Sequence, residues 1–88
     1  MRIKEGFVLK KLGIGFVVVT LGQAGMDFNG AIRMNETGAF LWQRIADGEG
    51  TREQLIGAML ARFEGLDRAA AAQDLDAFLN TISFALEE

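Results

Sequence analysis

The side chains that could carry chemistry in this 88-residue chain are carboxylates, lysines, arginines and hydroxyls, because it contains neither histidine nor cysteine. Those two residue types supply the usual general bases near neutral pH, the thiolate nucleophiles and most transition-metal ligands. Asp74 and Asp76 are two apart on a predicted helix and face different directions. Asp27 and Glu36 do not have the spacing of a calcium-binding loop. We therefore expect no enzyme activity, no metal site and no cofactor.

Two glycine-bearing stretches, Gly13-Ile14-Gly15 and residues 22–25, raise the question of a phosphate-binding loop. Neither is followed by Gly-Lys-Ser/Thr, and no helix is predicted to begin directly after either of them. Both stretches are therefore predicted to be turns.

The elements that would position any site begin with strands, because the first third of the chain is rich in β-branched and aromatic residues. Residues 7–11 and 16–20 are predicted to form a hairpin around the first glycine stretch. Asn29-Gly30 then supplies turn residues before a third strand from Ala31 to Met34. On that strand Ile32 and Met34 should share one face, with Ala31 and Arg33 on the other.

Three helices are predicted after the strands from capping residues and apolar spacing. Asn35 should cap the first, which ends at Gly48, and Thr51 should cap the second, which ends before Gly65. The third should begin at Asp67 and continue nearly to the C-terminus, with an apolar stripe of Ala71, Leu75, Phe78, Leu79, Ile82 and Leu86.

Strands followed by helices, without alternation, indicate an α+β fold with a three-stranded antiparallel sheet followed by three helices, in one domain of residues 1–88. Half of the residues are apolar and 24% are charged, which is typical of a globular domain. No apolar run reaches the roughly twenty residues that cross a bilayer, and no signal segment is evident. A cytoplasmic protein without membrane contact is expected.

The stretch from Asp27 to Trp42 contains an apolar strand followed by Asn-Glu-Thr-Gly-Ala-Phe-Leu-Trp, and it resembles the signature of the PqqD family. Farther along, the Asp47–Gly50 turn, the helix capped by Thr51 and the segment Asp74–Leu79 follow in the family's order. The resemblance covers nearly the whole chain. One departure is the segment Phe84–Glu88, where family members commonly carry a Gly-Leu-Leu-like ending.

The resemblance implies a winged helix-turn-helix-like fold and a non-catalytic role. Such domains bind the leader of a ribosomally made, later modified peptide and present it to a modifying enzyme, often a radical S-adenosylmethionine (SAM) protein. The family's leader adds as a strand beside the third strand and rests in a cleft against the third helix. The peptide-binding residues predicted on this basis are Ala31, Ile32, Arg33, Met34, Leu75, Phe78, Leu79 and Ile82.

Several alternatives stay open at this point. The four predicted residues on the third helix also fit core positions, as do Ile32 and Met34 on the apolar face of the third strand. The pathway is either pyrroloquinoline quinone synthesis or another peptide pathway. An open sheet edge permits a homodimer by strand exchange. A winged-helix DNA-binding module or a general protein-interaction module is the alternative function. A nucleic-acid partner is not expected, because the third helix carries only Arg68 as a cation against Asp74 and Asp76.

Overall fold

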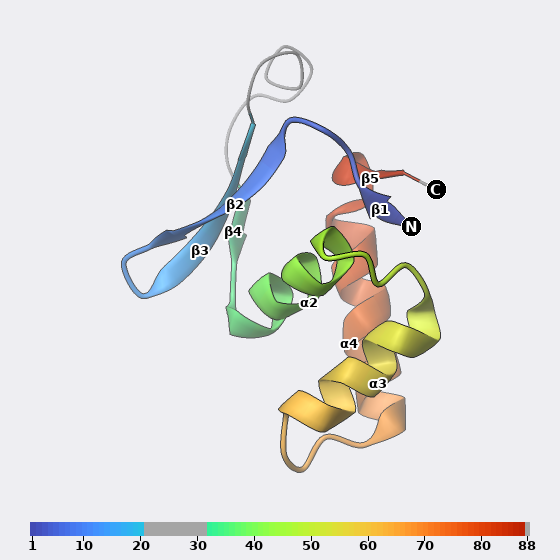
Figure 1. Cartoon of the computed structure of the whole chain (residues 1–88). Coiled ribbons are helices and arrows are strands. Elements are labelled where there is room, and N and C mark those ends of the chain that lie inside the picture. Colours follow the sequence, from blue (N-terminus) through green and yellow to red (C-terminus); the bar gives the residue numbers. More distant parts are fainter. Residues whose placement is uncertain (21–31, 88) are drawn as a thin grey trace.

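The computed structural model describes residues 1–20 and 32–87, which form a sheet beside a group of helices (Figure 1). The predicted Asn29-Gly30 turn and the predicted site residue Ala31 lie outside the described residues.

The predicted three-stranded antiparallel sheet is present, and its strands have the order β2-β3-β4. β2 (Phe7–Leu12) and β3 (Gly15–Thr20) form the hairpin, and β4 (Ile32–Met34) pairs with the other side of β3. The hairpin turn contains Gly13 with a φ of +64°, a conformation that glycine adopts without steric cost. The hairpin points away from the helices (Figure 1).

The two faces of this sheet differ because successive side chains alternate between them. The register pairs Phe16 with Met34 and Val18 with Ile32, so these four residues share the inner face. Val18 is completely buried there, and Met34 is 9% exposed. The outer face carries Val8, Lys10, Val17 and Arg33 in the same register.

The three helices are α2 (Glu36–Ala46), α3 (Arg52–Arg62) and α4 (Arg68–Thr81). Each begins at the predicted cap. The Asn35 side chain accepts a hydrogen bond from the Gly38 amide at 2.8 Å, and Asp67 accepts one from the Ala70 amide at 2.7 Å. Thr51 and Gln54 form a reciprocal capping box at the start of α3.

The predicted third helix is wrong at its C-terminal end. α4 stops at Thr81 and is followed by a 3₁₀ turn, η1 (Ser83–Ala85), and a short strand, β5 (Leu86–Glu87). β5 pairs antiparallel with β1 (Arg2–Ile3), which places the two ends of the chain side by side (Figure 1). The helix end was mispredicted because Leu86, although at helical spacing, lies half-buried in a strand. A strand of two residues is too short to leave a periodic pattern in a sequence.

The hydrophobic core is centred on α2, which contacts β2, β3 and β4 on one side and α3 on another. Trp42 of this helix is 3% exposed. None of the helices in the described part of the chain is long and apolar enough to span a membrane. The largest completely or almost completely buried side chains are Leu41, Ile45, Leu55, Ile56, Met59, Leu75, Ile82 and Val18.

Candidate functional site

β4 is an edge strand. It pairs with β3 along one edge, and no other strand among residues 1–20 and 32–87 pairs with its second edge. An unpaired edge presents backbone N–H and C=O groups in a row, which can accept another extended chain. This short segment is therefore a candidate site for main-chain recognition.

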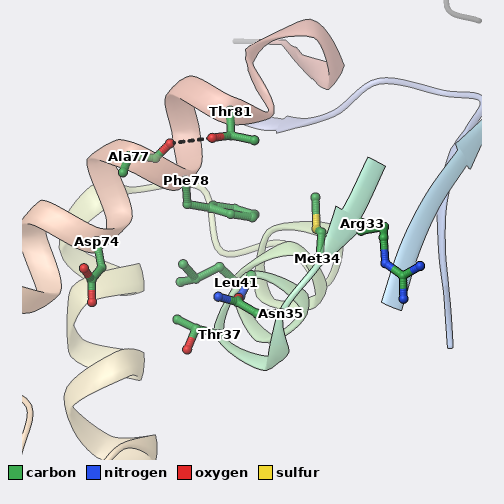
Figure 2. Close-up of a pocket in the computed structure, with 10 residues that line it drawn as sticks. Arg33, Met34, Asn35, Thr37, Leu41, Asp74, Ala77, Phe78 and Thr81 are labelled. Atoms are coloured by element: carbon green, nitrogen blue, oxygen red, sulfur yellow. Dashed lines mark hydrogen bonds between the residues drawn. The ribbon is translucent and has the colours of Figure 1, made fainter. Parts of the chain in front are cut away.

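A pocket of about 390 Å³ lies directly beside β4. β4 forms one side, the first turns of α2 form another, and α4 forms the opposite wall (Figure 2). The Phe78 ring extends from α4 toward Met34 of β4. The pocket is lined by Arg33, Met34, Asn35, Thr37, Gly38, Leu41, Asp74, Ala77, Phe78 and Thr81.

Gly38 allows the close packing of three elements at this pocket. A Cβ atom at this position would lie 3.4 Å from Cε1 of Phe78, 3.5 Å from Cβ of Met34 and 3.3 Å from Oδ1 of Asn35. The absence of a side chain therefore lets the Phe78 ring lie against the first turn of α2. A Cβ atom here would be tight only against the Asn35 oxygen and would make van der Waals contact with the ring and with β4, so a side chain larger than alanine has little room.

The polar groups around the pocket fall into two classes. The Thr81 hydroxyl donates to the Ala77 carbonyl at 3.0 Å, and Asn35 is occupied by its cap hydrogen bond. The exposed Asp74 carboxylate makes no hydrogen bond or ion pair with any residue that the structure describes. The pocket is thus lined by the apolar side chains of Met34, Leu41 and Phe78 and by polar side chains, among them the unpaired Asp74 carboxylate.

The charged groups on the other side of α4 are already paired. Arg52 of α3 binds Asp76 with N–O distances of 2.8 and 2.9 Å, and this hydrogen bond lowers the pKa of the Asp76 carboxyl. Arg68 pairs with Glu53. The cation of α4 is therefore neutralised by a neighbouring helix.

The chain also matches the model of a known protein family. The model of the family described as coenzyme PQQ synthesis protein D (PqqD) matches residues 17–83. The chain belongs to the PqqD family. No curated protein matched it.

Two solved structures share the fold of this PqqD-family chain. One is TbiB1 in complex with the TbiA(beta) leader peptide, 23% identical with a TM-score of 0.74, where the match covers 96% of this chain and 90% of that one. The other is lasso peptide synthetase B1 complexed with the leader peptide, 21% identical with a TM-score of 0.74, covering 98% of this chain and 96% of that one.

The structure divides the predicted peptide-binding residues of the PqqD-family chain into two groups. Arg33, Met34 and Phe78 line the pocket, and Ile32 lies next to them on β4, half-buried. Leu75 and Ile82 are 0% exposed and belong to the core. Leu79 is half-buried, packs against that core and does not line the pocket. Three of the four helix positions therefore take the alternative role of core packing.

The pocket wall on α4 contains residues that the apolar stripe did not reveal. Asp74, Ala77, Phe78 and Thr81 follow the spacing i, i+3, i+4, i+7, which places them on one helix face. Three of the four are small or polar, so a search for apolar periodicity passes over them. Thr37, Gly38 and Leu41 of α2 were likewise not predicted, although the last of these is a completely buried core residue.

Proposed function

We propose that this PqqD-family chain is a non-catalytic module that binds the leader segment of a ribosomally synthesised precursor peptide. The leader adds as a strand along the free edge of β4, and one of its apolar side chains enters the neighbouring pocket. The observation that carries the proposal is the position of the pocket directly beside the β4 edge, with which no other strand of the described residues pairs. Ladder hydrogen bonds give affinity without regard to sequence, whereas a pocket selects side chains.

Family membership and the solved structures support this role. Both similar structures hold a leader peptide. Among the described residues no group of three or more His, Cys, Asp or Glu side chains lies together to hold a metal ion. In this proposal residues 1–88 act as one domain, and the bound peptide is presented to a modifying enzyme, a radical SAM protein or another class.

The test begins with a displayed library of random peptides selected on the purified protein. A selected peptide is titrated into the isotopically labelled protein, and the amide shifts are followed by NMR. The largest shifts should fall on Ile32, Arg33, Met34 and Phe78. Shifts confined to the β2–β3 turn or to α3 would reject the site.

Strand addition is tested separately by methylating each backbone nitrogen of the selected peptide in turn. Along a strand, successive N–H groups point to opposite edges, so only every second amide donates to β4. Affinity should therefore fall at alternate positions. A loss without this period of two would contradict strand addition while leaving peptide binding intact.

A further inference from the structure

Arg33 has an unusual position in the candidate site. It lies on β4 and is exposed, yet its side chain points away from Met34 and Phe78 (Figure 2). Its Nη2 atom lies 3.8 Å from the position that a Cβ atom on Gly15 would occupy. Arg33 therefore borders the pocket at β4, while its guanidinium lies over β3 on the outer face of the sheet, turned away from the pocket interior.

Arg33 also differs from the other arginines of the chain. Each of the five others forms an ion pair with a carboxylate, at Arg2, Arg44, Arg52, Arg62 and Arg68. Arg33 makes no ion pair or hydrogen bond with any residue of the described segments 1–20 and 32–87. An arginine left unpaired at an open strand edge can still take an acidic partner from outside.

The sheet around Arg33 contains no acidic partner. Strands β2, β3 and β4 have the sequences FVLKKL, GFVVVT and IRM, with three cations and no carboxylate. On the outer face the register places Val17 opposite Arg33, and Lys10 opposite Val17. This row of side chains is apolar and basic, so it favours a carboxylate at the next position, where an added strand would lie.

The geometry of strand addition fixes where that carboxylate must be in the peptide. The peptide residue directly beside Arg33 points to the outer face, and its two neighbours point to the inner face, where Met34 and the pocket lie. This alternation holds whether the peptide runs parallel or antiparallel to β4. The residue beside Arg33 and the residue that enters the pocket are therefore an odd number of positions apart, and adjacent in the simplest arrangement.

We propose that Arg33 is a specificity-determining residue that selects peptides with Asp or Glu beside the apolar residue that enters the pocket. The inference rests on the proposed function and deepens it by naming the substrate class: an extended segment in which an apolar anchor and an acidic residue occupy opposite faces. An opposite-charge cross-strand pair changes affinity by about 1.5- to 5-fold.

The test repeats the selection of a displayed random peptide library on four proteins. Wild type and Arg33→Lys should both enrich Asp or Glu at an odd distance from the apolar anchor. Arg33→Glu should enrich Lys or Arg at that position instead. Lys10→Glu is the matched control, because it makes the same change of charge on the same face but lies two strands away from the β4 edge. It should keep the acidic preference.

Calorimetry on one selected peptide then measures the pairing. Exchanging its acidic residue for the neutral amide should weaken binding to wild type by about 1.5- to 5-fold, and exchanging it for Lys should restore binding to Arg33→Glu. Selected peptides that bind at β4 with an apolar anchor but no charge preference, or with the same preference on Arg33→Glu, overturn this inference and leave the proposed function standing. Failure to enrich any peptide on wild type overturns both.

Discussion

The α3–α4 helix pair and the β4 edge differ in how far their polar groups are paired within the described chain. In the helix pair, Thr51 and Asp67 cap the first turns, and two ion pairs, Arg52 with Asp76 and Arg68 with Glu53, join one helix to the other. At the β4 edge, the outer backbone groups of a three-residue strand meet no other strand of the described chain. Arg33 of β4 has no charged partner among the described residues, and neither has Asp74, on the side of α4 that lines the pocket.

The two regions also differ in how deeply they reach into the core. α3 contributes Leu55, Ile56 and Met59, each at most 1% exposed, whereas β4 contributes Met34 at 9%. The helix pair therefore holds the fold, and the charged groups between its two helices are already paired with one another. Exposed groups at the β4 edge are hydrated, so a ligand can replace that water at small cost. The contrast predicts that stability and binding can be altered separately.

The largest expected effect is a loss of folding stability, caused by a substitution in the α3–α4 helix pair. Leu75→Ala should lower the free energy of unfolding by about 2–5 kcal/mol, because it leaves a cavity at a completely buried position of α4. Urea unfolding followed by circular dichroism measures the change. Peptide affinity, measured under conditions where the variant is still folded, should stay near that of wild type. A stability change below about 1 kcal/mol would mean that Leu75 is not the core residue described above.

The next effect is a loss of peptide affinity, caused by a substitution in the pocket beside β4. Phe78→Ala should weaken binding of a selected peptide by about tenfold or more, because it removes the aromatic wall of the pocket. Phe63→Ala is the matched control: this half-buried ring packs against Phe40 at a centroid distance of 5.4 Å and does not line the pocket beside β4. Equal loss of affinity in both variants would indicate a general loss of structure in place of a pocket contact.

The smallest effect concerns the ion pair between α3 and α4. Because Arg52 lowers the pKa of Asp76 in the folded state, the pair stabilises the fold above the ordinary aspartate pKa of about 3.9, and this contribution is lost as the pH falls through the lowered value. Arg52→Gln should lower the melting temperature slightly at pH 7, and the difference from wild type should shrink toward pH 2. A difference that grows in acid would have the wrong sign for this pair.

Much of the fold was predictable because its signals are local. The caps at Asn35, Thr51 and Asp67 depend on one side chain and an amide three residues away, so a sequence shows both partners. The end of α4 was not predictable in this way. Leu86 keeps the helical spacing, but pairing between β5 and the distant β1 takes it into a strand, supported by the Arg2–Glu87 ion pair at 2.7 Å.

The sequence by itself determined the three strands of the larger sheet, the starts of the three helices, their order and the apolar stripe of α4, since these follow from local caps and from periods of two and 3.6 residues along a single segment. Only the tertiary structure decided which face of α4 meets β4. Leu75 and Ile82 turn into the core, while Phe78, with the small and polar Asp74, Ala77 and Thr81, forms the pocket wall. The physical reason is that a sequence shows the apolar stripe of a helix but not the rotation at which the helix docks. That rotation is set by the packing of α4 against α3 and by the contact of Phe78 with α2 at Gly38.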